Sequence, residues 1–109
     1  MRVIFLPEVY DYFKDLVEIL YQEEYFGFQE SAYNYVEELV DDILTTLPIR
    51  QQKPAPSHFD RYGKGMYYAT FRKNKQTTWY AFFAKYNENG ITFYLVRHIA
   101  NNHTVAQHL

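Results

Sequence analysis

The stretch "TTWYAFFAKYNENGITFYLVRHI", residues 77–99, predicts two antiparallel strands joined by a tight turn. Both halves are rich in aromatic and β-branched residues, which favour the extended backbone of a strand. Between them lies Asn89-Gly90, a dipeptide that tolerates the positive φ angles of a two-residue hairpin turn. Apolar residues occupy consecutive positions in both halves, so we expect the middle strand of the sheet to be covered on both faces.

Two further strands complete the predicted sheet. "MYYATFR" (66–72) precedes the turn "KNK" (73–75), and the two consecutive hairpins form an antiparallel meander. "RVIFL" (2–6) is a short apolar run bounded by Pro7, which predicts a buried strand. We expect this strand to join the meander, because an unpaired buried edge would leave backbone groups without hydrogen bonds.

Two amphipathic helices are expected between the first strand and the meander. The first begins at Pro7, which suits a first helical turn because it has no N–H to lose. The second covers about residues 29–47 and ends at Pro48. Gly27, in "YFGF" (25–28), is the expected C-cap between them. Apolar residues recur at helical spacing at Val9, Phe13, Leu16, Val17 and Leu20 and again at Ala32, Val36, Leu39, Val40, Ile43 and Leu47.

The order of elements defines an α+β fold of the form β-α-α-β-β-β. We expect the two-helix hairpin to pack on one face of a mainly antiparallel four-stranded sheet, leaving the second face partly open. Residues 48–65 read as a loop because three of the four prolines lie there. A loop of this length in a compact domain either carries function or packs against the rest of the protein.

Composition limits the class of protein. A chain of 109 residues with 48% apolar residues predicts a single domain, 1–109. The absence of cysteine excludes disulfides and thiolate metal sites. No apolar run approaches the roughly 20 residues that span a bilayer, and the N-terminus does not resemble a signal peptide. We therefore expect a cytoplasmic protein that does not associate with membranes.

Charge is divided unevenly along the chain. Residues 1–48 have a balance of −9, whereas residues 49–109 have a balance of +7 and contain all four histidines. This division favours a basic surface that binds a polyanion, with the acidic elements elsewhere. The alternative is that the acids only coat the solvent faces of the two helices.

The element order, the size and the last strand resemble the RelE/ParE superfamily, the toxins of type II toxin–antitoxin pairs. The most diagnostic stretch is "RKNKQTTWYAFFAKYNENGITFYLVRHIANNH" (72–103). Arg72 matches the basic residue that the family has before the first hairpin turn. Trp79-Tyr80 lies where the family usually has Tyr-Arg, and His98 matches the histidine that closes the last strand. Two arginines common in the family, one of them after the last strand, are replaced here.

The resemblance implies a toxin that inhibits translation as a metal-independent, ribosome-dependent mRNA endoribonuclease without a cofactor. The implied partners are a cognate antitoxin protein and mRNA on the ribosome. The missing arginines favour an alternative, a non-catalytic family member that binds a partner such as DNA gyrase or has lost its activity. A third interpretation, unrelated to the family, is an interaction domain whose aromatic face binds a peptide.

Cleavage of this kind uses the 2′-OH of the RNA as nucleophile and needs a base, a cation for the phosphate and an acid for the leaving oxygen. Histidine suits proton transfer near neutral pH, and arginine binds phosphate oxygens bidentately. The candidate catalytic residues are His98, Arg72, Tyr80 and His103, and the candidate nucleic-acid-binding residues are Lys73, Lys75, Arg97, Lys64 and Arg61. No metal site is expected, because the spacings of five between His98, His103 and His108 fit no tight ligand pair.

Strand geometry limits how these residues combine. Successive side chains alternate between faces, so Arg97 and His98 point apart unless a bulge or the strand end intervenes. One hypothesis places His98 on the open face with Tyr94, Arg72 and Tyr80, with His103 folding over from the tail. The simpler alternatives are a hydrogen-bonded histidine at a strand end, a surface ion pair between Arg97 and an acidic helix, and a solvated tail that carries His103 and His108.

Overall fold

The computed structural model describes residues 2–22, 27–105 and 108–109. The chain folds in the order β1 (Arg2–Phe5), α1 (Pro7–Gln22), α2 (Gln29–Thr46), the 3-10 helix η1 (Leu47–Ile49), β2 (Lys53–Pro54), the 3-10 helix η2 (Ser57–Tyr62), β3 (Tyr67–Arg72), β4 (Thr78–Glu88), β5 (Ile91–Asn101) and α3 (Asn102–Val105). The predicted cap of the first helix at Gly27 depends on residues 23–26, which lie outside the described residues.

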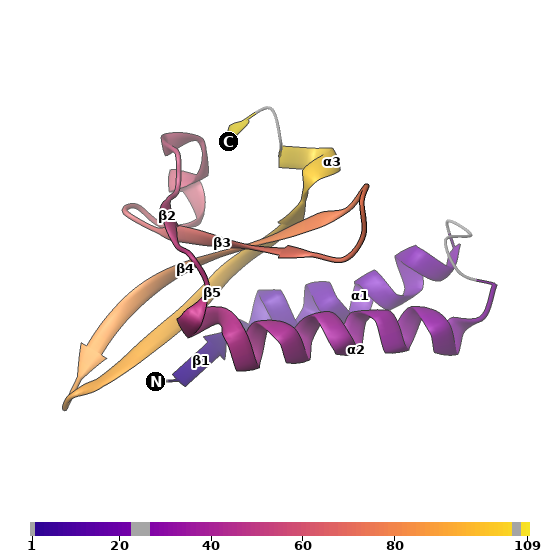
Figure 1. The fold of residues 1–109 in the computed structure, drawn as a ribbon, viewed down its shortest axis with the longest axis horizontal. Helices are drawn as coiled ribbons and strands as arrows, with labels where there is room; N and C mark the ends of the chain where they lie inside the picture. The colour runs from indigo at the N-terminus through magenta and orange to yellow at the C-terminus, as the bar shows by residue number, and fades with distance from the viewer. Residues whose placement is uncertain (1, 23–26, 106–107) are drawn as a thin grey trace.

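One sheet with the strand order β1-β5-β4-β3-β2 forms the centre of the fold. β1 pairs with β5 in parallel, and all other pairs are antiparallel. The α1–α2 hairpin lies along one face of this sheet, which confirms the predicted α+β class (Figure 1). No helix within the described residues is long and apolar enough to cross a membrane.

The sheet has five strands, so the prediction of four was wrong. The additional strand, β2, comes from the segment predicted to be a loop and pairs with Tyr67 and Tyr68 of β3. Ala55, which follows it, donates its backbone N–H to the Met66 carbonyl over 2.9 Å. Two residues are too few to show a periodicity, and Pro54 is tolerated because β2 is an edge strand.

The turn between β4 and β5 matches its prediction. Asn89 has a φ of 53° and Gly90 a φ of 80°, the two positive values that the hairpin turn requires. The register continues to Glu88 and Ile91, the last pair before the turn. This turn therefore sets the pairing of the two longest strands, from which the rest of the sheet extends.

The main core lies between the sheet and the helix hairpin. Its fully buried side chains include Leu39 and Ile43 of α2 and Phe71 and Phe83 of the sheet. Trp79 of β4 is 2% exposed and donates its indole N–H to the Tyr35 hydroxyl of α2 over 2.9 Å. This hydrogen bond satisfies a polar group that would otherwise be buried without a partner.

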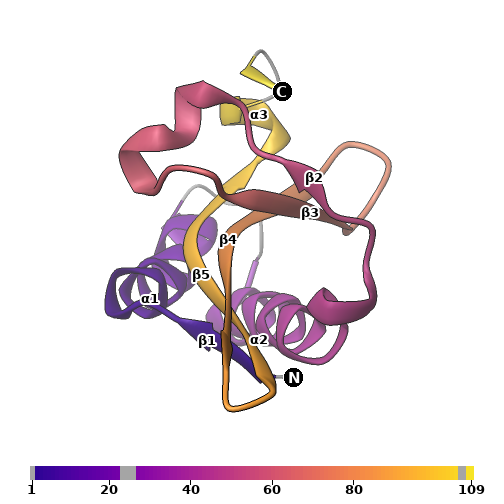
Figure 2. The same cartoon turned by 90° about the vertical axis from the view of Figure 1, so that its left-hand side faces the viewer.

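A smaller core covers part of the second face of the sheet. Phe59 of η2 stacks on Phe82 of β4 with 4.3 Å between ring centroids, and both side chains are buried. Met66 and Ala100 complete this cluster. Figure 2 shows the segment after α2 rising past β3 to the end of the molecule where α3 and the C-terminus lie. The segment predicted to be a loop therefore packs, and the second face is less open than expected.

A β-bulge interrupts the pairing of β4 and β5. Phe82 pairs with His98 and Phe83 pairs with Val96, so Arg97 is an extra residue in β5. After this bulge, even-numbered residues of β5 point to the second face, whereas before it they point to the main core. Tyr94 packs in the core beneath the sheet, whereas the His98 ring lies against Phe82 on the second face. The expectation that Tyr94 shares a face with His98 was wrong, because it assumed an uninterrupted strand.

The hydrogen bond to Trp79 can be tested with Tyr35→Phe. Loss of the hydroxyl leaves the indole N–H buried without an acceptor, and we expect the free energy of unfolding to fall by about 1–2 kcal/mol. Urea denaturation gives this value. Tyr33→Phe is the matched control, because Tyr33 lies on the same helix with an exposed side chain and should change stability by less than about 0.5 kcal/mol. Equal stability of the two variants would contradict a role for this hydrogen bond.

Candidate functional site

A hollow of about 380 Å³ lies between η2 and the end of β5. We call it the histidine pocket, defined by His58, Arg61, Tyr62, His98 and His108, with Tyr12 and Asn101 also in its lining. The pocket exists because Phe59 fixes η2 on Phe82 and so holds the neighbouring side chains of η2 over β5. His58, Arg61 and Tyr62 of η2 thereby face the same space as His98 of β5 and His108 near the end of the chain.

The centre of the pocket is a stacked pair of rings. Tyr62 and His98 lie 3.8 Å apart between centroids, with only 8° between their planes. Burial, together with the positive charge of Arg61, lowers the pKa of His98 to about 4. The His98 imidazole is therefore neutral at neutral pH and is able to accept a proton.

A second stacked pair closes the outer end of the pocket. His58 and His108 lie 3.6 Å apart with 6° between their planes. Arg61 places a guanidinium nitrogen 3.5 Å from His58 Nε2. Partial loss of hydration, followed by the electrostatic influence of His108 and Arg61, lowers the pKa of His58. This stacking places His108 against η2 and in the lining of the pocket. The alternative of a fully solvated tail therefore does not hold for His108.

The bulge brings Arg97 to the same region as His98. Both line a hollow of about 450 Å³ that also has Tyr62 of η2 and Glu8 of α1 in its lining. The Arg97 guanidinium donates a hydrogen bond to the Tyr86 hydroxyl over 3.0 Å. The bulge in β5 thus allows Arg97 and His98 to line the same hollow, whereas in a regular strand their side chains would point to opposite faces.

Gly63 makes room for the Arg97 side chain. A Cβ atom at Gly63 would lie 3.0 Å from Arg97 Cδ, and the φ of 148° is one that side-chain-bearing residues rarely adopt. The backbone conformation therefore favours glycine at this position, and a larger residue would also have to displace the Arg97 side chain.

Arg72 and Tyr80 lie on the same face as His98 but outside the histidine pocket. Arg72 is opposite Thr78 and His98 is opposite Phe82, four residues along β4, or about 13 Å at the rise of a strand. Tyr80 packs near Tyr68, with 6.0 Å between centroids. Arg72 donates a hydrogen bond to the Asn74 carbonyl over 3.2 Å. The three expected residues share a face without forming one site.

The remaining predicted residues are dispersed. Lys73 reaches the helix side, where it forms an ion pair with Glu38 at 3.6 Å and lies 5.0 Å from the Tyr35 ring. Lys64 and Lys75 are exposed in turns. His103 is exposed at the start of α3 and lines a separate hollow beside Trp79. Of the nine predicted residues, the histidine pocket contains His98 and Arg61.

Tyr62, His58 and His108 were not predicted as site residues. The signal for them is weak: "SHFDRY" (57–62) places His58 and Arg61 three residues apart, so one helical turn brings them to the same side. Among the described residues, no three histidine, aspartate or glutamate side chains are arranged to hold a metal ion.

No family model, curated protein or solved structure gives a significant match to this chain.

The pKa of His98 predicts how stability depends on pH. In the unfolded chain histidine titrates near pH 6.5, whereas folding lowers the pKa of His98 to about 4. As the pH falls through this interval the unfolded state binds a proton first, so stability is lost. We expect His98 to reduce the free energy of unfolding by roughly 2 kcal/mol between about pH 7 and about pH 4.5, allowing for its partial exposure.

Urea denaturation of the wild type and of His98→Gln at both pH values measures this contribution as the difference between the two proteins. His103→Gln is the control, because it removes an exposed imidazole on α3 that lies outside the histidine pocket. Identical pH dependence in wild type and His98→Gln would show that His98 is not held neutral by the fold.

Proposed function

We propose that this protein is the toxin of a type II toxin–antitoxin pair, similar to the RelE/ParE superfamily, and that it acts as a ribosome-dependent mRNA endoribonuclease. The histidine pocket is the observation that carries this proposal. It combines a neutral imidazole at His98, a cation at Arg61 and two further imidazoles on one side of the sheet. These are the groups that cleavage through the 2′-OH requires, and none of them depends on a metal.

We infer a role in the cleavage for each of these groups from its position in the pocket. His98 accepts the proton of the 2′-OH as its oxygen bonds to phosphorus, and the bond from phosphorus to the 5′ oxygen breaks. Arg61 stabilises the charge that develops on the phosphate oxygens. The departing 5′ oxygen takes up a proton, for which we assign the His108 imidazole, because the lowered pKa of His58 disfavours its protonated form. Tyr62 keeps the His98 ring in place through its stacking contact of 3.8 Å.

A second candidate is a protein of the same family that binds its target without cleaving it, such as an inhibitor of DNA gyrase. A pKa of about 4 makes His98 a weak base, and Arg72 and Tyr80 lie away from the pocket. Both observations favour binding over catalysis. Either candidate implies a cytoplasmic protein with an antitoxin partner that covers the pocket and neutralises it.

The two candidates predict different results after induced expression in bacteria. Growth arrest is expected for both, but new 5′ ends in mapped mRNA are expected only for the endoribonuclease. His98→Ala should relieve arrest and reduce the new ends by at least about tenfold, because the proton acceptor is lost. The variant must remain soluble and folded, which circular dichroism establishes.

His103→Ala is the matched control, because His103 lies outside the pocket, and it should remain toxic. Arrest without new mRNA ends would favour the binding protein, and unchanged cleavage in His98→Ala would remove this histidine from the mechanism. Absence of arrest with soluble protein would contradict both toxin proposals.

A further inference from the structure

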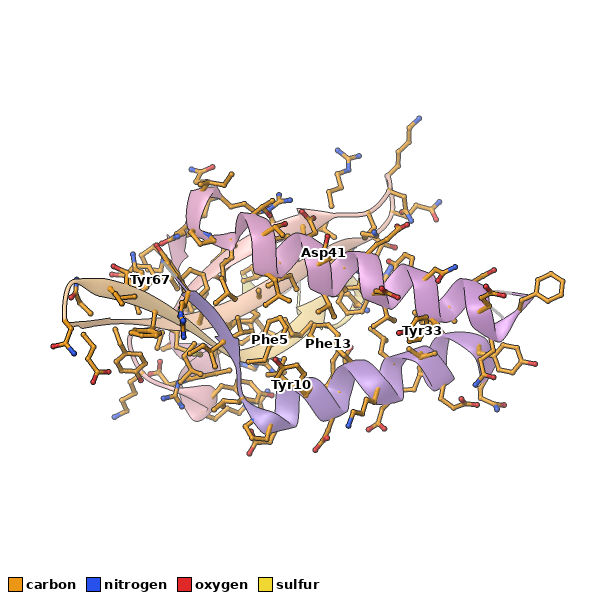
Figure 3. All side chains as sticks on the ribbon, turned by 90° about the horizontal axis from the view of Figure 1, so that it is seen from below. Phe5, Tyr10, Phe13, Tyr33, Asp41 and Tyr67 are labelled. Atoms are coloured by element: carbon orange, nitrogen blue, oxygen red, sulfur yellow. The ribbon has the colours of Figure 1, made fainter. Side chains whose placement is uncertain are left out.

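The outer surface of the α1–α2 hairpin, which faces away from the sheet, has an apolar groove. Figure 3 looks onto this surface and shows Tyr10 and Phe13 of α1 and Tyr33 of α2 along the line between the helices. The groove has a volume of about 230 Å³ and also has Val17 and Val40 in its lining. We call it the hairpin groove.

Aromatic side chains are exposed at this groove. Tyr10 is 50% exposed and Tyr33 is 55% exposed, the two largest exposed fractions among the large apolar side chains of α1 and α2. The Tyr10 ring is held by an edge-on contact with Phe5, with 5.3 Å between centroids. Partly exposed tyrosines that are already fixed in position lose little entropy on binding, which is typical of binding surfaces.

Acidic side chains border the groove on α2. Glu37 lines it, and Glu37 and Asp41 also line an adjoining hollow of about 500 Å³ that shares Val40 with the groove. Within the described residues, no hydrogen bond or ion pair engages the carboxylate of Glu37 or Asp41. Lys14 is the one basic side chain in the described lining. The surface is therefore apolar at its centre and negative at its α2 edge.

Charge determines which occupant fits. Two copies of this chain would place acidic edges against each other, and residues 1–48 carry eleven acids against two bases, so self-association through this face is disfavoured. The same charge repels nucleic acid and anionic membrane surfaces. An amphipathic helix fits both features, because its apolar stripe fills the groove while lysine or arginine on its flank meets Glu37 and Asp41.

We propose that the hairpin groove is a docking site for a basic amphipathic helix of a partner protein. The hairpin groove shares no lining residue with the histidine pocket, and the proposal does not depend on the function proposed for that pocket. Binding there leaves the pocket accessible.

The probe is a synthetic peptide of about 18 residues with leucines at helical spacing and lysines on both flanks, labelled for fluorescence anisotropy. The control is a peptide of the same sequence with glutamate at every lysine position. We expect the lysine peptide to bind at least about tenfold more tightly than the glutamate peptide, and to weaken as NaCl rises from about 50 to about 500 mM. Equal binding of the two peptides, or no binding of either, would overturn the proposal.

Variants locate the binding surface. Tyr33→Ala should weaken binding of the lysine peptide by about tenfold, and the double variant Glu37→Gln/Asp41→Asn should reduce both affinity and salt dependence. Ile91→Ala and Glu88→Gln are the controls, because they change an exposed apolar and an exposed acidic residue on the β4–β5 hairpin. Loss of affinity in the controls equal to that in the groove variants would contradict this location.

Sedimentation of the chain alone should show a monomer, and a dimer disrupted by Tyr33→Ala would assign the groove to self-association instead.

Discussion

The extra residue at Arg97 is the constraint on which the candidate site depends. β4 is buried on both faces, with Phe82 above the sheet and Phe83 below it, both fully buried. A regular β5 would send His98 into the same core as Tyr94 and Val96, where an imidazole would need a hydrogen-bonding partner. The bulge reverses the alternation, so His98 lies on the second face and Ile99 returns to the main core. Because of this one extra residue, the apolar side chains of β5 stay in the main core while His98 lines the histidine pocket on the second face.

The second face shows how the same contacts provide both stability and a site. Phe59 on Phe82 is an apolar contact that ties η2 to the sheet. It also fixes Tyr62 over His98 and brings Arg61 close enough to influence the pKa of that ring. A histidine held neutral beside a guanidinium costs stability at low pH, and such a cost is typical of functional positions. The site is built on short 3-10 structure anchored by one aromatic ring.

Acidic and basic side chains lie on different parts of the fold. The described acids of residues 1–48 lie on α1 and α2, whose buried apolar side chains face the sheet, so these carboxylates lie on the solvent side of the hairpin. The bases of the second part lie on the sheet, its turns and η2. Two of them form ion pairs with α2, Arg50 with Asp42 and Lys73 with Glu38. The sequence division of −9 and +7 therefore leaves an acidic surface on the helix hairpin, whereas the bases of the second part are spread over the sheet, its turns and η2. The acidic surface attracts ligands of positive charge through its long-range field.

The sequence by itself determined the α+β class, the two helices, the meander and the Asn89-Gly90 turn, because periodicity and turn chemistry are local properties. It also suggested His98 and Arg61 as candidates by residue type, and both line the histidine pocket. The tertiary structure decided which residues meet: the two-residue strand β2, the bulge at Arg97, and the contacts of His58, Tyr62 and His108. These arise from packing between segments up to about half the chain apart, and packing leaves no periodic pattern in the sequence. A strand of two residues and a bulge of one are too short to change local periodicity, so only the folded chain reveals them.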